Sequence, residues 1–251
     1  MTRKSVLAGA RLTVGTIQRS RACTARSAFP VANSDAQAPD HLPGRPCGQL
    51  AYYRAIAPEY EQHALPFAGG DELSAALDAF EPTGTVLELA CGSGAWTEQL
   101  LRHATEITAV DASPEMLSIA AARVNSERVR FVRANIFEWE PDRRYEMVFL
   151  GFWLSHVPLE RFASFWSLVA DCLNPGGRVF FVDDAYRTED ELIEGAASST
   201  IRRRLNDGTA YRAVKVPYRT NDLEERLART GWRVTVTQTA GPFYWGAGCP
   251  A

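Results

Sequence analysis

The sequence predicts an α/β fold with a doubly wound, mainly parallel, seven-stranded sheet and helices on both faces. Short apolar runs alternate with amphipathic helical segments between residues 85 and 182, and a turn of small residues around Gly92 and Gly94 follows the first run. The chain has 251 residues, of which 46% are hydrophobic, and this is enough for one sizeable domain. Strands separated by helices of this length form parallel units with right-handed crossovers.

Helix-start and helix-stop signals place the elements of the first two thirds of this domain. Asp71 is a candidate N-cap, and Ser113-Pro114-Glu115 combines a cap, a proline at the first helical position and an acid in the first turn. A glycine pair after Pro175 ends another helix. We therefore expect short helical pieces on either side of Pro58, helices at residues 71–80, 95–102, 113–124 and 158–173, and strands at residues 85–89, 106–110, 129–133, 145–150 and 178–182.

The C-terminal third has a different pattern. Residues 189–205 are predicted to be helical, and residues 211–216 and 234–239 are predicted to be strands. A capping-box-like sequence at Asn221 begins a helix that Gly231 ends. Together with the preceding elements, these strands complete a Rossmann-like sheet.

The N-terminal segment differs from the rest of the chain in charge. Residues 1–48 have a net charge of +5 and contain several prolines, whereas residues 49–251 have a net charge of −8. We expect residues 1–48 to be a disordered basic extension and residues 49–251 to form the folded domain. The alternative for the extension is an organelle transit peptide, because it is rich in Arg, Ser and Ala and has no acid before Asp35.

Composition excludes several classes of function. The acidic domain argues against nucleic-acid binding and suits a small neutral or cationic substrate, although net charge decides little about one pocket. The five cysteines form no C-x-x-C pair, so neither a metal site nor a disulfide framework is expected. No apolar run reaches the roughly 18 residues of a membrane span. We therefore expect a cytoplasmic protein without a membrane partner, either a monomer or a homodimer, with organelle targeting as the alternative.

The turn after the first predicted strand indicates a nucleotide-type pocket. Glu88 and Ala90 precede Gly92 and Gly94, and a helix begins directly afterwards. Glycines let the backbone bend sharply and approach a ligand, and a helix N-terminus favours anionic groups. A dinucleotide fingerprint requires a third glycine, but Thr97 stands at that position. An NAD-dependent enzyme is an alternative, and the missing third glycine argues against it.

Polar residues follow the next strands, where the carboxyl ends of parallel strands meet at one edge of the sheet. Asp111 ends the second strand, 23 residues after Glu88, at a spacing that suits a ribose-binding acid. Asn135 and Ile136 follow the third strand and are placed to hold an adenine ring. His156 follows the fourth.

This order of motifs resembles the small-molecule branch of the class I S-adenosylmethionine-dependent methyltransferases, over about residues 50–246. The chain departs from the family's common pattern by having Ala90 in place of glycine and Asn135 in place of aspartate. The resemblance implies S-adenosyl-L-methionine (SAM) as the cofactor and a small-molecule acceptor as the partner. It implies that the cofactor-binding residues are Tyr53, Glu88, Ala90, Gly92, Gly94, Asp111, Ala112, Met116, Asn135, Ile136 and Gly151.

Methyl transfer from a sulfonium mostly requires alignment of donor and acceptor, and a base only where the acceptor must lose a proton. His156 is the candidate catalytic base, and a structural role as a helix cap is the alternative. The candidate substrate-binding residues are mostly aromatic: Phe152, Trp153, Asp184, Tyr186 and Tyr244. The run Arg202-Arg203-Arg204 is expected on a solvated helix face.

The sequence therefore predicts an enzyme of small-molecule metabolism. It would transfer a methyl group from SAM to an O or N atom of a small, aromatic or apolar metabolite by in-line displacement. The alternative is a non-catalytic SAM-binding sensor or scaffold, because the glycine turn and the acidic residues fit both functions.

Overall fold

The central sheet is present in a computed structural model of the chain, which describes residues 32–33, 48–63 and 69–251. All described residues belong to the compact unit formed by residues 31–251. The predicted disordered extension lies almost wholly outside the described residues. Within the described part of the chain, no helix is long and apolar enough to cross a membrane.

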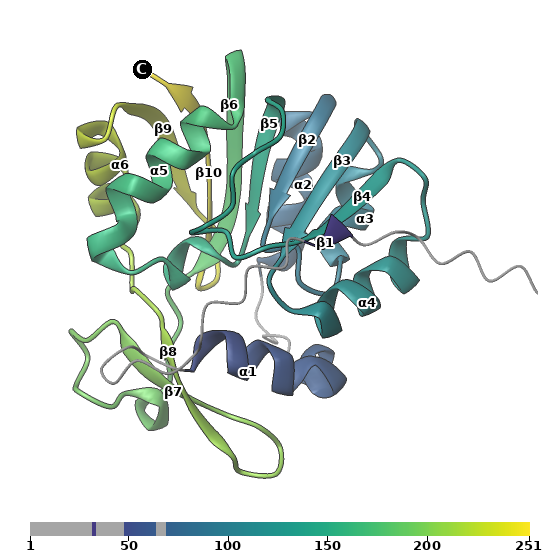
Figure 1. The fold of residues 1–251 in the computed structure, drawn as a ribbon. Coiled ribbons are helices and arrows are strands. Elements are labelled where there is room, and N and C mark those ends of the chain that lie inside the picture. Colours follow the sequence, from purple (N-terminus) through teal and green to yellow (C-terminus); the bar gives the residue numbers. More distant parts are fainter. Residues whose placement is uncertain (1–31, 34–47, 64–68) are drawn as a thin grey trace, which may run out of the picture. The chain divides into compact units, whose positions relative to one another are not determined.

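The main sheet has the strand order β1-β4-β3-β2-β5-β6-β10-β9 (Figure 1). The predicted seven-stranded, mainly parallel sheet is present, but the segment predicted as a strand at residues 211–216 lies outside it, in the separate hairpin of β7 (Thr200–Arg204) and β8 (Ala210–Val214), and β10 takes the seventh place. β1 adds two residues at one edge by pairing in parallel with β4. β10 is antiparallel to both of its neighbours. The bounds are Ala32–Asn33 for β1, Gly84–Leu89 for β2, Ala104–Asp111 for β3, Val129–Arg133 for β4, Tyr145–Gly151 for β5, Leu173–Asp184 for β6, Trp232–Gln238 for β9 and Phe243–Pro250 for β10.

Helices cover both faces of this sheet (Figure 1). Leu77 of α2, Leu100 of α3 and Leu117 of α4 pack with Val86 and Phe180 on one face. On the other face, apolar side chains of α5 and α6 pack against alternate residues of the same strands. Burial of each such side chain contributes about 1.5–3 kcal/mol. The bounds are Gly70–Phe80 for α2, Ala95–Leu100 for α3, Pro114–Val124 for α4, Phe162–Asp171 for α5 and Thr220–Arg229 for α6.

The prediction of a helix over residues 189–205 is wrong. This segment contains a short 3-10 turn, η4 (Glu189–Glu191), and then strand β7 (Thr200–Arg204), which pairs with β8 (Ala210–Val214). Gly195 has a φ of +84°, a conformation that interrupts a helix. Ile201 is fully buried by the hairpin, so tertiary packing overrides the local helical preference.

Strand β10 has no counterpart among the sequence predictions. Its glycines make the segment look like a loop, but they are needed in the sheet. A Cβ on Gly246 would lie 2.2 Å from the ring of Phe181, and one on Gly248 would lie 2.0 Å from the carbonyl oxygen of Arg233. Small residues let β10 fit between β6 and β9.

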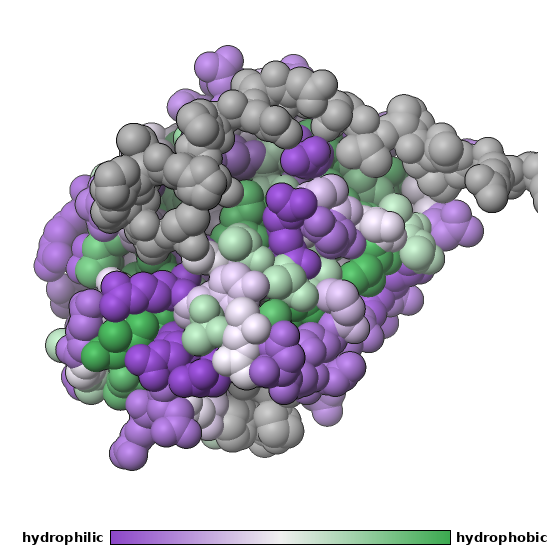
Figure 2. Space-filling model, turned by 60° about the horizontal axis from the view of Figure 1, so that its bottom comes forward, coloured by the Kyte–Doolittle hydropathy of each residue, from purple (hydrophilic) through white to green (hydrophobic). Residues whose placement is uncertain are grey.

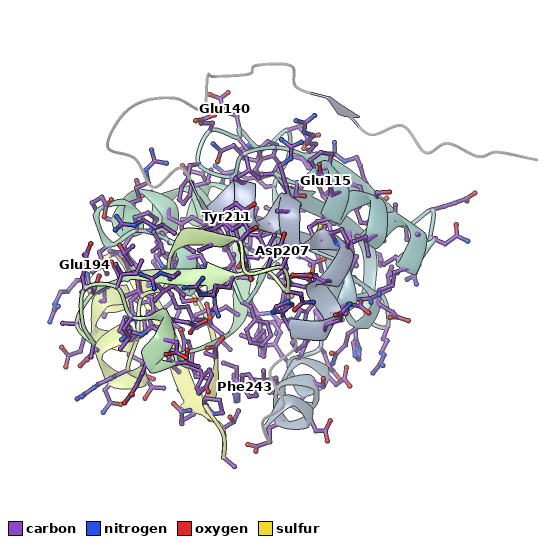
Figure 3. All side chains as sticks on the ribbon, turned by 90° about the horizontal axis from the view of Figure 1, so that it is seen from below. Glu115, Glu140, Glu194, Asp207, Tyr211 and Phe243 are labelled. Atoms are coloured by element: carbon purple, nitrogen blue, oxygen red, sulfur yellow. The ribbon has the colours of Figure 1, made fainter. Side chains whose placement is uncertain are left out.

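A small cap lies at the carboxyl edge of the parallel strands (Figure 1). It consists of α1 (Gln49–Ile56), the 3-10 helix η1 (Ala57–His63) and the β7–β8 hairpin. The rings of Tyr52 and Tyr211 lie 5.8 Å apart, and the backbone N–H of Asn206 donates to Glu59 at 2.8 Å. Figure 3 shows the hairpin, with Tyr211 and Asp207 labelled, in front of the sheet when the molecule is viewed from below.

Candidate cofactor and acceptor site

Two adjoining cavities lie between the cap and the carboxyl edge of the sheet. Their volumes are about 870 Å³ and about 290 Å³. The smaller one is lined by Asp111, Asn135 and Ile136, the residues expected to hold adenosine, so we call it the adenosine cavity, and we name the larger one the acceptor cavity after the ligand expected beside it. Both are lined by the same group of residues, here called the shared rim: Tyr53, Tyr60, Ala90, Gly92, Gly151, Phe152 and His156.

The turn after β2 forms one wall of the shared rim. Ala90 has a φ of +58° and Gly92 a φ of +53°, so the backbone turns sharply twice within three residues. A Cβ on Gly92 would meet no atom within 4 Å, which means that a side chain there would extend into cavity space. The φ of Ala90 explains why glycine suits this position, because alanine pays about 1–2 kcal/mol for left-handed backbone.

Asp111 fixes the geometry of the adenosine cavity. Its Oδ2 accepts the backbone N–H of Gly92 at 2.9 Å, and its Oδ1 accepts that of Ser113 at 2.8 Å. Burial raises the pKa of Asp111, while these backbone donors act in the opposite direction. Each carboxylate oxygen keeps a second lone pair, so the side chain can still accept ribose hydroxyl groups.

Other residues predicted to bind the cofactor line the rest of this cavity. Ala112, Met116, Asn135 and Ile136 line it as expected. Asn135 Oδ1 accepts the backbone N–H of Phe137 at 3.2 Å, which leaves its NH₂ group available to a ring nitrogen. The open space at Gly92, the bonded carboxylate and this apolar slot together fit an adenosine-containing cofactor.

Two residues predicted to touch the cofactor, Glu88 and Gly94, do not line either cavity. Glu88 is buried beneath the turn and accepts the Thr97 hydroxyl at 2.5 Å, and burial raises its pKa to about 8. Gly94 has a φ of +80°, and a Cβ there would lie 2.9 Å from the Cβ of Ala120. Both residues therefore hold α3 in place beneath the site.

His156 lies on the shared rim, where the sequence places it. Its Nδ1 donates to the carbonyl oxygen of Val214 at 2.5 Å, so in the neutral ring Nε2 is the acceptor. Tyr53 donates its hydroxyl to this Nε2 at 3.0 Å. Burial lowers the pKa of His156 well below its ordinary value, and the charges of Lys215 and Arg203 lower it further. The imidazole is therefore neutral and acts as a hydrogen-bond acceptor.

A buried ionic cluster lies below His156. Lys215 Nζ contacts Asp184 Oδ2 at 2.8 Å, Asp183 Oδ1 at 3.4 Å and Ser155 Oγ at 3.1 Å, so all three of its donors are used. Burial raises the pKa of Asp183, and Lys215 opposes that shift. Removing one partner would leave an uncompensated buried charge, so this cluster holds the floor of the acceptor cavity rigidly.

The predicted acceptor-binding residues do not all lie in the acceptor cavity. Asp184 and Tyr186 line the acceptor cavity, and Phe152 lines both cavities. Trp153 lines only the adenosine cavity. Tyr244 is fully buried in the core, because alternation along β10 directs Tyr244 and Phe243 to opposite faces.

Phe243 is therefore the residue of this strand that lines the acceptor cavity, and it is labelled in Figure 3.

The expectation that the arginine run lies on a solvated helix face is wrong. Arg202, Arg203 and Arg204 belong to β7 and all line the acceptor cavity. Arg203 keeps 25% of its side chain exposed and forms an ion pair with Glu191. Burial raises the pKa values of Tyr53 and Tyr60, and the positive charge of Arg203 counteracts this rise.

Sequence reasoning missed Arg203 and Lys215 because both depend on the hairpin. A strand assignment for β7 would have provided a signal, since it would have directed Arg203 to the same side as the buried Ile201.

Figure 2 shows polar and apolar residues interleaved on the cap side of the molecule. No group of three or more potential metal ligands occurs in the described part of the chain.

The fold and the site define a nucleotide-binding methyltransferase architecture, and comparison with known proteins agrees. Residues 86–177 match the family described as "Methyltransferase domain". The structure of a DhpI–SAH complex is 38% identical, with a TM-score of 0.71 over 81% of this chain and 95% of that chain. A DhpI–SAM–HEP complex is 37% identical, with a TM-score of 0.73 over 80% and 95%. This chain belongs to the class I SAM-dependent methyltransferases, whose cofactor is S-adenosyl-L-methionine.

More distant relatives have named substrates. Trans-aconitate 2-methyltransferase of Sinorhizobium medicae is 29% identical over 63% of this chain and 61% of its own length. Malonyl-[acyl-carrier protein] O-methyltransferase 2 of Ilyobacter polytropus is 24% identical over 57% and 56%. Demethylmenaquinone methyltransferase of Bacillus licheniformis is 34% identical over 38% and 42%. The chain thus spans about half the length of these relatives.

Proposed function

We propose that this protein transfers the methyl group of SAM to an oxygen atom of a small organic acid and so forms a methyl ester. This proposal narrows the expectation of O- or N-transfer to an aromatic or apolar metabolite. The aromatic part of the expectation is kept, because Trp96, Phe152, Tyr186 and Phe243 line the acceptor cavity and suit the carbon skeleton of the acceptor.

The observation that carries the proposal is the place of Arg203. Arg203 lines the cavity that an acceptor would enter, and its ion-pair partner Glu191 lines the same cavity. A guanidinium group has a planar set of donors that matches a carboxylate in two-point contact. An acid bound there would have its carboxylate held inside the acceptor cavity.

The state of His156 supports an acceptor that is already ionised. Free carboxyl groups have pKa values of about 4, so they are deprotonated at neutral pH and need no catalytic base. His156 is neutral, and burial together with nearby positive charge lowers its pKa, which makes it a poor base. In this proposal His156 holds the Tyr53 hydroxyl in place by accepting its proton in a hydrogen bond.

The cofactor would be held by the turn after β2 and by Asp111, with the adenine ring near Asn135 and Ile136. Bound SAM supplies a methyl group on a positively charged sulfur, which is already an activated leaving group. The chain's own contribution is to orient the acceptor at the shared rim and to exclude water beneath the cap. The names of two relatives, acting on trans-aconitate and on a malonyl group, favour the same class of acceptor.

A methyl-transfer screen tests this function. The protein and labelled SAM are incubated with matched sets of dicarboxylic and tricarboxylic acids, their amides, phenols and amines. Transfer to an acid with little transfer to its amide supports the proposal. Transfer to phenols or amines alone would overturn it. Tight SAM binding without transfer to any compound would favour the sensor or scaffold alternative.

A further inference from the structure

Glu191 forms an ion pair with Arg203, the cation proposed to bind the acceptor. Its Oε1 forms the ion pair with Arg203, and its Oε2 accepts the backbone N–H of Thr188 at 3.0 Å. Only 16% of the Glu191 side chain is exposed, and the residue lines the acceptor cavity together with Arg203. The chain thus places one of its own carboxylates at the position proposed for the carboxylate of a substrate.

We propose that Glu191 is a specificity-determining residue: its carboxylate occupies Arg203 in the free protein, and the acidic group of an acceptor displaces it on binding. This inference rests on the proposed function. Compounds without an acidic group cannot replace the ion pair, because they would leave both Arg203 and Glu191 without partners in a half-buried site. Glu191 thereby admits acids and rejects neutral analogues of the same shape.

The surrounding structure permits this exchange. The loop between β6 and β7 is closed by other contacts, since Arg187 donates to the carbonyl oxygens of Ala196 at 2.6 Å and of Ser198 at 2.5 Å. Leu192 also bridges to Ile201 on β7. Because these contacts do not involve the Glu191 carboxylate, they still hold the loop when the side chain leaves Arg203 and its second contact, the Thr188 N–H. Its release into the open part of the cavity costs less than exposing core residues would.

Charge in the cavity favours displacement by acids with more than one charge. Asp184 is already neutralised by Lys215, whereas no ion pair or hydrogen bond engages the Arg202 side chain within the described residues. An acceptor with two acidic groups can replace Glu191 at Arg203 and still bring a second negative charge into a cavity that Arg202 and Arg204 also line. A single carboxylate offers Arg203 no more charge than Glu191 does, so it must compete on equal terms.

Binding of succinate to the full-length protein loaded with S-adenosylhomocysteine tests the inference. Calorimetry compares the unchanged protein with Glu191→Gln, which keeps the size of the side chain and removes its charge. We expect about a tenfold gain in succinate affinity, because the competing carboxylate is gone. Glu189→Gln is the matched control: it makes the same change on the same turn, at an exposed position outside both cavities, and should leave affinity unchanged.

Two further readouts separate the possible failures. Hydrogen exchange at residues 188–192 should increase when succinate binds to the unchanged protein, and succinate should cause no such increase in Glu191→Gln. An unchanged or lower succinate affinity in Glu191→Gln would overturn the inference. If Arg203→Gln still abolished binding in that case, the proposed acid site would stand. Succinate binding that is indifferent to Arg203→Gln, or undetectable in both the unchanged protein and Glu191→Gln, would instead overturn the proposed function together with this inference.

Discussion

The two cavities are built in different ways. Much of the adenosine cavity is lined by short turns that directly follow β2, β3, β4 and β5, and α1, η1 and Val214 of β8 complete its lining. The acceptor cavity brings together α1, η1, the loop after β6 and the β7–β8 hairpin, which are distant in the sequence. Most residues expected to hold the cofactor therefore follow strand ends, whereas the residues expected to select the acceptor depend on how the cap packs.

The largest expected effect is a loss of SAM affinity from a substitution in the adenosine cavity. Asp111→Ala removes the acceptor of the Gly92 and Ser113 N–H groups and the proposed ribose contact at once. We expect SAM affinity to fall by about 100-fold or more, since each hydrogen bond to a charged group is worth about 1.5–3 kcal/mol. Calorimetric titration with SAM measures it. The control, Asp142→Ala, removes an exposed carboxylate paired with Arg130 and should bind SAM normally.

Arg203→Gln tests the acceptor side alone. We expect transfer to an acid acceptor to fall by about 30-fold, because one charge-assisted contact is lost, while SAM affinity stays unchanged. Steady-state kinetics and a SAM titration on the same preparation measure the two effects. Arg229→Gln removes an exposed helical arginine and is the control. Equal losses of SAM affinity and transfer would show that the two cavities are not separable in this way.

Glu88→Gln tests the support beneath the cofactor turn. The pKa of Glu88 is raised to about 8 in the folded state, whereas an unfolded chain has a value near its ordinary 4.5. The folded state therefore binds more protons between these values, and stability falls as pH rises through this range. The glutamine variant should be free of this loss and gain on the order of 2 kcal/mol at alkaline pH. Denaturant unfolding across pH measures it, and a variant that loses stability at alkaline pH would contradict the assignment.

His156→Gln tests whether the imidazole positions Tyr53 or removes a proton. Transfer to an acid acceptor should fall by about tenfold, and the rate should stay flat with pH in both proteins above the pKa of the acceptor. A rate that rises with pH in the unchanged protein, and loses this rise in the variant, would restore the role of a base. Tyr53→Phe should reproduce the loss, because it removes the hydroxyl that His156 holds.

The smallest effect is expected at Ala90. Ala90→Gly relieves left-handed backbone but makes the unfolded chain more flexible, so the two contributions nearly cancel. We expect a change in unfolding free energy below about 1 kcal/mol and unchanged SAM affinity. Thermal unfolding and titration measure these quantities. A large loss of affinity would mean that the Ala90 methyl group itself contacts the cofactor.

The same contrast explains what the sequence could predict. Gly92, Asp111, Asn135 and His156 follow recognisable strands, and parallel strands bring their ends to one edge, so their convergence was predictable. Arg203 was assigned to a helix because the segment around it lacks clear alternation, and only pairing with β8 makes it a strand. Tyr244 was misplaced for a similar reason, since β10 was not recognised and its alternation could not be used.

Buried contacts also escaped sequence reasoning. The role of Glu88 depends on the Thr97 hydroxyl nearby, and that of Lys215 depends on Asp183 and Asp184, two pairings that no local pattern reveals. Residue type alone made Glu88 a candidate for cofactor contact, and Lys215 was not predicted to belong to the site. Their hydrogen-bond partners show instead which of them support the site from below.

The chemical lability of the transferred methyl group tests the central claim most directly. The full-length protein is incubated with labelled SAM and the small-molecule fraction of a cell extract, and the labelled products are treated with mild alkali. A methyl ester of an acid releases its label as volatile methanol, and the account predicts that nearly all of the label is released. Label that stays bound through this treatment would show transfer to nitrogen, carbon or an ether oxygen and would contradict the account.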